Sequence, residues 1–208
     1  MTMHKSESKQ HWQDVYDGRA SEALSWYQER PETSLAMIAA SGLGKTAAII
    51  DVGGGASRLA DHLIAAGYSD VRVLYIAALA LTAAQQRLGA EADAITWLTA
   101  DATEWTPPQR YAIWHDRAVF HFLTEAAERR AYVERLEAAL AGDGQAVIAT
   151  FALDGPERCS GLTVQRYDSE GLARELGTAF ALVETRTESH MTPGGMAQKF
   201  QYSGFARS

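Results

Sequence analysis

The chain has 208 residues, of which 47% are hydrophobic and 22% are charged, as in a globular protein with one sizeable core. The formal net charge of −7 argues against a nucleic-acid partner, because such proteins use a basic face to neutralise phosphates. The single cysteine, Cys159, excludes an intrachain disulfide, and no apolar stretch reaches membrane-spanning length, so we expect a cytoplasmic protein with no membrane partner.

Residues 1–40 are rich in aromatic side chains. Trp12 and Tyr16 are four residues apart and therefore fit one face of a helix. Trp26 and Tyr27 are adjacent, so they cannot both lie on one helix face, and at least one of them is available to cover a pocket. The pair has two possible roles, which are packing in the core and covering a site as a lid.

Short apolar runs then alternate with helical patterns, which predicts a parallel sheet covered on both faces. In chain order we expect a helix over Glu32–Ala40, a strand over Ala47–Val52, a helix over Ser57–Ala66, a strand over Val71–Ile76, a helix over Leu79–Leu88, strands over Ile95–Leu98 and Tyr111–Trp114, a helix from a cap at Thr124 to Leu140, and a strand over Gln145–Phe151.

The last part of the chain has a different pattern. Asp168 is a suitable cap for a helix that ends at Leu176. Strands over Phe180–Thr187 and Gln198–Ala206 follow, joined by a turn at residues 193–195. A hairpin at the end of a parallel sheet must contribute an antiparallel strand.

The most informative segment is the first strand with the turn that follows it. The strand contains Asp51 and runs directly into Gly53, Gly54 and Gly55, and a helix comes next. Glycines permit a tight turn and let a ligand approach the backbone, and the helix offers free N–H groups. This arrangement predicts a ligand site at the turn.

The segment resembles motif I of class I S-adenosylmethionine-dependent methyltransferases, in which an acid precedes Gly-x-Gly. The resemblance to a bacterial, small-molecule branch of that superfamily covers most of the chain, through His11-Trp12, Ser25-Trp26-Tyr27-Gln28 with Pro31, Asp101-Ala102-Thr103, and Trp114-His115-Asp116-Arg117 with Phe120 and His121. It implies an α/β, Rossmann-like three-layer sandwich whose seven-stranded, mostly parallel sheet has the order 3-2-1-4-5-7-6, with strand 7 antiparallel. It also implies one domain over residues 1–208, in which residues 1–40 form a lid element and residues 47–208 the core.

The resemblance further implies a site for S-adenosylmethionine, which leaves as S-adenosylhomocysteine. The implied cofactor contacts are Trp26, Asp51, Gly53, Gly54, Gly55, Tyr75, Ile76, Asp101, Ala102 and His115. The catalytic candidates are His115 and Asp116, although packing against the cofactor is the slightly favoured role for His115, because methyl transfer needs alignment more than proton removal. The expected substrate contacts are Tyr27, Arg117, His121, Arg158 and Arg166, and for the two loop arginines a purely solvated role stays open. No spacing of histidine and cysteine indicates a metal site.

One position departs from the family. Class I enzymes normally end the second strand with an acid that accepts both ribose hydroxyls, whereas this chain has Tyr75 there. It lies about 20 residues after the glycine turn, where dinucleotide-binding folds also place an acid. Ala77 and Leu79 are also more apolar than in the family, so drift or engineering of the cofactor site is one interpretation.

The function that the sequence predicts is methyl transfer to a small-molecule nucleophile. A protein lysine methyltransferase and a repurposed scaffold with altered cofactor use are the alternatives. An NAD-dependent oxidoreductase is less favoured, because Arg58 stands where the dinucleotide fingerprint requires glycine or alanine. The acceptor atom and the oligomeric state stay open.

Overall fold

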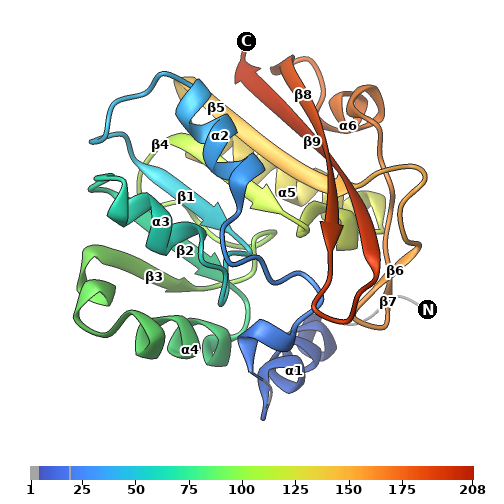
Figure 1. Ribbon diagram of the computed structural model, residues 1–208. Coiled ribbons are helices and arrows are strands. Elements are labelled where there is room, and N and C mark those ends of the chain that lie inside the picture. The colour runs from blue at the N-terminus through green and yellow to red at the C-terminus, as the bar shows by residue number, and fades with distance from the viewer. Residues whose placement is uncertain (1–4, 19) are drawn as a thin grey trace.

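A computed structural model describes residues 5–18 and 20–208, and its centre is a seven-stranded sheet (Figure 1). The strand order across the sheet is β3-β2-β1-β4-β5-β9-β8. The first five strands in this order are parallel, whereas β9 is antiparallel to both of its neighbours. The strands are β1 (Ile49–Val52), β2 (Val71–Tyr75), β3 (Ile95–Thr99), β4 (Tyr111–Arg117), β5 (Leu140–Phe151), β8 (Phe180–Met191) and β9 (Ala197–Arg207).

This order confirms the expected topology, because β8 and β9 are the sixth and seventh strands of the large sheet. A separate two-stranded hairpin, β6 (Arg158–Cys159) with β7 (Leu162–Thr163), lies in the connection after β5. The sequence predicted only a loop there. Ser160 and Gly161 form the turn of this hairpin, and both have positive φ angles.

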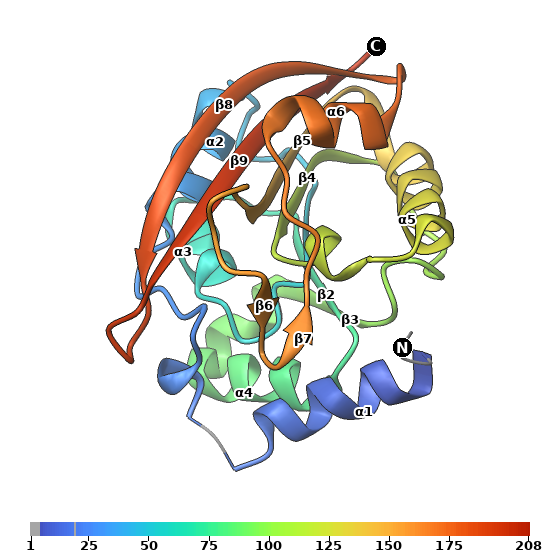
Figure 2. The same cartoon turned by 90° about the vertical axis from the view of Figure 1, so that its right-hand side faces the viewer.

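Helices cover both faces of the sheet, so the fold has the three layers of an α/β sandwich (Figures 1 and 2). Buried side chains of α2, α3 and α4 pack on one face, and those of α5 and α6 pack on the other. None of the described helices has the length and apolarity that crossing a bilayer requires. The helices are α1 (Lys5–Tyr16), α2 (Glu32–Ala40), α3 (Leu59–Ala65), α4 (Ala78–Leu88), α5 (Ala126–Ala139) and α6 (Ser169–Leu176), with short 3₁₀ turns η1 (Ser21–Ala23), η2 (Gly89–Ala94) and η3 (Phe120–Phe122).

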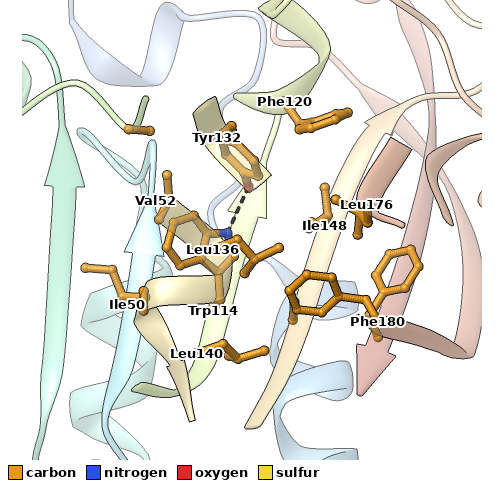
Figure 3. Packing of buried hydrophobic residues seen from close by; sticks show 14 of the residues in the cluster. Ile50, Val52, Trp114, Phe120, Tyr132, Leu136, Leu140, Ile148, Leu176 and Phe180 are labelled. Atoms are coloured by element: carbon orange, nitrogen blue, oxygen red, sulfur yellow. Dashed lines mark hydrogen bonds between the residues drawn. The ribbon is translucent and has the colours of Figure 1, made fainter. Parts of the chain in front are cut away.

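Every residue of β1 is buried, because the sheet is covered on both sides. Successive side chains point to opposite faces, so Ile50 and Val52 pack toward α5 while Ile49 packs toward α3. Figure 3 shows the α5 side of this core, where the Trp114 indole N–H donates a hydrogen bond of 2.8 Å to the Tyr132 hydroxyl. The core therefore fixes the carboxyl ends of β1 and β4 side by side.

Several boundaries differ from the sequence prediction. The strand β5 begins at Leu140 instead of Gln145, and β8 extends to Met191 instead of Thr187. Two further differences lie near the ends of the parallel strands. Thr124 is not the cap of α5: the helix begins at Ala126, and Glu125 caps it through reciprocal bonds with Glu128. Such a capping box satisfies free N–H groups at the helix start, which a lone hydroxyl would not do as fully. In addition, β4 continues past Trp114 to Arg117, so it includes two buried polar side chains that the sequence placed beyond the strand.

Candidate functional site

Two adjoining cavities lie at the carboxyl ends of the parallel strands, where ligands of open α/β sheets bind. The small cavity has a volume of about 40 Å³ and the large cavity about 520 Å³. They adjoin because Trp26, Gly53 and Arg117 line both. The small cavity is also lined by Tyr27, Ser34, Asp51, Gly54 and His115. The large cavity is also lined by Trp12, Tyr75, Ile76, Asp101, Ala102, Val119, Phe122, Arg158 and Phe200, among others.

The glycine turn after β1 forms part of the wall of both cavities. Gly53 has a φ of 77°, and a Cβ at this position would overlap the Val119 side chain. A Cβ at Gly54 would overlap the carboxylate of Asp51. Gly55 also has a positive φ but lines neither cavity, since it packs against the protein. The turn requires glycine because neighbouring side chains leave no room for a Cβ.

A buried hydrogen-bonded relay joins three elements at the small cavity. His115 of β4 contacts Oδ1 of Asp51 through Nδ1 at 2.7 Å and the Ser34 hydroxyl through Nε2 at 2.9 Å. All three residues are at most 2% exposed. An ionised carboxylate only accepts, so Nδ1 donates to Asp51, and in the neutral imidazole Nε2 accepts from Ser34 of α2. Both ring nitrogens of His115 are therefore engaged within the protein.

Asp116, the next residue of β4, lines neither cavity. Its buried carboxylate accepts bonds from the backbone N–H groups of Val119 and Phe120 at 2.7 and 3.1 Å and from the Tyr132 hydroxyl at 2.6 Å. Burial raises the pKa of Asp116 to about 6. The side chain thus holds the turn that follows β4.

Arg117, the last residue of β4, lies at the junction of the cavities. Its Nε donates to the Tyr202 hydroxyl at 2.9 Å, and one terminal nitrogen donates to the Trp26 carbonyl at 3.2 Å. The other lies 3.5 Å from Glu188, and the guanidinium stacks over the Phe200 ring at 4.1 Å. Arg117 therefore places a fixed positive charge beside both cavities.

The other predicted substrate residues separate into two groups. Tyr27 lines the small cavity and bonds to Glu29, and Arg158 lines the large cavity and bonds to the Gly161 carbonyl. His121 and Arg166 line neither cavity.

His121 is fully buried, and burial lowers its pKa to about 3. Its Nδ1 accepts from the Phe151 N–H at 3.2 Å. Arg166 instead braces the loop before α6, through the Gly155 carbonyl at 3.0 Å and Glu157 at 3.0 Å. The structure thus does not bring these two side chains into the site.

The ends of β2 and β3 form the wall of the large cavity. Beyond β3, Asp101 accepts bonds from the backbone and hydroxyl of Thr103 at 2.8 and 2.7 Å. Ile76 and Ala102 add apolar surface beside it. This part of the wall combines one carboxylate with flat apolar contacts, which suits a planar ring that carries a hydrogen-bond donor.

Aromatic rings from the N-terminal segment continue this wall. Trp12 meets Phe122 with ring centroids 5.0 Å apart and Trp26 at 5.9 Å, both nearly edge to face. Tyr75 lies 6.4 Å from Trp12 and 5.7 Å from Tyr16. Trp12, which lies on α1 as the spacing predicted, is thus part of the cavity wall as well as of a packed helix face.

The sequence did not indicate Ser34, Phe122 or Phe200 as parts of the site. Ser34 is 81 residues from His115 in the chain, and no local pattern marks the contact. In the described part of the chain, no group of three or more histidine, cysteine or acidic side chains is placed to hold a metal ion.

Comparisons with known proteins support the fold. No protein-family model matches the chain, and no curated protein matches it. The chain is similar to a solved structure from work on the conversion of a disulfide bond into a thioacetal group during echinomycin biosynthesis, with 18% identity, 96% of this chain and 91% of that chain covered, and a TM-score of 0.78.

Two further structures are methyltransferases. The chain is similar to 1,6-didemethyltoxoflavin N1-methyltransferase of Burkholderia thailandensis, bound to 1,6-didemethyltoxoflavin and S-adenosylhomocysteine, with 19% identity, 100% and 91% coverage and a TM-score of 0.74. It is also similar to magnesium protoporphyrin IX methyltransferase of Synechocystis PCC 6803, with bound S-adenosylhomocysteine, at 17% identity, 100% and 89% coverage and a TM-score of 0.66. The chain therefore has the fold of these methyltransferases.

Proposed function

We propose that the chain is an S-adenosylmethionine-dependent methyltransferase that methylates a small-molecule nucleophile, with residues 1–208 acting as one domain. The observation that supports this best is the course of the large cavity. It begins at Gly53, passes the ends of β2 and β3, and continues between aromatic side chains. Its volume of about 520 Å³ is within the usual range of small-molecule sites.

The residues present fit two parts of the cofactor and depart at a third. The wall around Asp101, Ala102 and Ile76 suits an adenine ring. The small cavity beside Gly53, with its polar lining, suits an amino-acid group. At the ribose position, by contrast, Tyr75 replaces the acid that such folds place after the second strand.

When bound, the cofactor supplies a methyl group that its sulfonium already activates, so the protein has to align the acceptor and exclude water. The relay leaves His115 no free nitrogen, and we therefore assign it a positioning role beside the small cavity. Trp12 and Trp26 cover the site from the N-terminal lid. Tyr27, Arg117 and Arg158 are the substrate contacts that we retain, because each lines a cavity.

Ligand-induced stabilisation tests the proposal. A ligand that binds only the folded state raises the melting temperature. We expect a shift with S-adenosylhomocysteine and none with NAD at the same concentration. A shift with NAD alone would contradict the proposal. Incubation with methyl-labelled cofactor and a cell extract, separated by size, would then assign the acceptor to small molecules or to proteins.

The role of His115 is tested by His115→Ala. If His115 positions the ligand, affinity for S-adenosylhomocysteine falls, and kcat falls no further than the loss of binding explains. If His115 removes a proton from the acceptor, kcat falls while affinity is retained. Calorimetry and turnover with an acceptor from the labelling experiment separate the two.

A further inference from the structure

The end of β2 lacks the acid that binds ribose hydroxyls in related folds. β2 lies next to β1, and Tyr75 is its last residue, so this side chain faces a ligand bound at the glycine turn. An acid at this point accepts ribose hydroxyls in related α/β folds. Acids that line the large cavity are Asp101, Glu125 and Glu128.

These three acids lie outside β2. Asp101 follows β3 and is bonded to Thr103. Glu125 and Glu128 form the capping box of α5. The ribose position thus depends on Tyr75.

The Tyr75 hydroxyl is itself engaged within the protein. It is hydrogen-bonded to Tyr16, whose hydroxyl also bonds with Trp26 and with the backbone of Ala56. Burial keeps Tyr75 protonated by raising its pKa well above the usual value. Its oxygen therefore carries no charge, and it is a weaker acceptor for ribose hydroxyls than a carboxylate.

The ring of Tyr75 also closes the space against the turn. A Cβ built on Gly55 would lie 3.1 Å from this ring and 3.1 Å from the Tyr16 hydroxyl. Ring and turn are thus already nearly in contact. A sugar bound here meets an aromatic wall on this side.

We propose that Tyr75 determines cofactor specificity, because with Tyr75 in place of an acid the site does not distinguish cofactors that have both ribose hydroxyls from those that lack one. This inference rests on the proposed function. It assigns to the site a cofactor class broader than the natural one: adenosyl thioethers and sulfoniums whose sugar lacks the 2′- or 3′-hydroxyl bind about as well as the ribose forms.

The test is calorimetric titration of the full chain with S-adenosylhomocysteine and its 2′-deoxy and 3′-deoxy analogues. For the wild type we expect the three dissociation constants to agree within about threefold, because no charged acceptor is lost with either hydroxyl. Tyr75→Asp supplies that acceptor. It should bind S-adenosylhomocysteine about tenfold more tightly than the wild type, and should discriminate against each analogue by about tenfold or more.

Tyr75→Phe is the matched control, since it keeps the ring and removes only the hydroxyl. We expect it to match the wild type within about threefold for all three ligands. A tenfold loss of affinity for S-adenosylhomocysteine in Tyr75→Phe would show that the hydroxyl binds the ribose, and would overturn the inference. So would tenfold discrimination by the wild type.

The other outcomes are also decisive. If the wild type binds S-adenosylhomocysteine but discriminates against the analogues, the inference is wrong and the proposed function survives. If the wild type binds none of the three ligands while Tyr75→Asp binds S-adenosylhomocysteine, Tyr75 blocks the subsite, and both the inference and the proposed function are wrong for this chain. If neither protein binds any of them, the proposed function fails. The comparison of wild type with Tyr75→Phe decides the inference even if Tyr75→Asp does not fold.

Discussion

Neighbouring strand ends in this molecule are built on opposite principles. At the ends of β1 and β4, the buried side chains of Asp51, His115 and Asp116 are polar and are held by a set of directed hydrogen bonds. At the end of β2, one strand away, Tyr75 and Tyr16 belong to a cluster of aromatic rings. The polar end depends on every donor having its acceptor, whereas the aromatic end depends mainly on packing.

This difference predicts where the protein is sensitive to substitution. Removing one member of a polar network leaves its partner buried and unsatisfied, which costs more than the bond itself contributed. Trimming one atom from an aromatic cluster leaves most contacts in place. We therefore expect the largest effects at the ends of β4 and β1 and the smallest at the end of β2.

The largest expected effect is a pH dependence from Asp116. Its pKa is raised from 3.8 to about 6, so the folded state binds this proton more tightly than the unfolded state. The resulting stability is fully present below about pH 4 and is lost as the pH rises through about 6. Two units correspond to about 3 kcal/mol.

Asp116→Asn removes this titration, so the informative quantity is the wild-type unfolding free energy minus that of the variant. Urea denaturation from pH 4 to pH 7 should show this difference falling by about 2–3 kcal/mol. A difference that stays flat would mean that the three hydrogen bonds keep Asp116 ionised at low pH.

The second effect concerns the turn after β1. Gly53→Ala places a Cβ at a φ of 77° and into the Val119 side chain. The left-handed conformation alone costs about 1–2 kcal/mol, and the overlap adds to it. Thermal or urea unfolding measures the loss. Adding Val119→Ala to the Gly53→Ala chain should restore the stability lost to the overlap but not the stability lost to backbone strain. If the double variant is no more stable than Gly53→Ala, the whole loss comes from the backbone.

The sequence predicted the end of β1 correctly and the end of β4 too early, and both results have a physical reason. The turn at Gly53 was visible because an apolar run leads directly into the glycines. The end of β4 was placed too early, at Trp114, because His115 and Asp116 are polar and a buried strand normally is not. Their partners, Ser34 and Tyr132, are distant in sequence, so local pattern does not reveal that they are satisfied.

In the rest of the chain, too, features set by neighbouring residues were predicted, and features set by contacts distant in sequence were not. The Asp168 cap was predicted, and its side chain accepts from the Gly171 N–H at 2.6 Å, within four residues. The β6–β7 hairpin was missed, because strands of two residues have no periodicity. Likewise, nothing local shows that Arg158 lines a cavity while Arg166 does not.

A third and smaller effect is expected at the relay. Ser34→Ala removes the hydroxyl bonded to His115 and leaves Nε2 buried without a partner, which costs about 1–2 kcal/mol. Thr33→Ala, one residue earlier in α2, is the matched control and should cost about 0.5 kcal/mol or less. Equal losses in urea denaturation would mean that the relay adds nothing beyond helix packing.

The smallest effect is expected in the aromatic cluster. Tyr16→Phe keeps the ring against Trp26 and Tyr75 and removes only the hydroxyl, so the loss should be about 1 kcal/mol. Tyr27→Phe is the control with a more exposed ring. If Tyr16→Phe costs more than Ser34→Ala, hydrogen bonding dominates at the end of β2 as well, and the contrast between the strand ends is wrong.

The position of β9 has a consequence for synthesis of the protein. β9 lies between β5 and β8, so an interior strand of the sheet is synthesised after both of its neighbours. At about 5–20 residues per second, β5 waits several seconds with one edge unpaired. An unpaired apolar edge is a template for other chains. The nascent protein is therefore most exposed to aggregation between the synthesis of β5 and that of β9, when chaperone protection matters most.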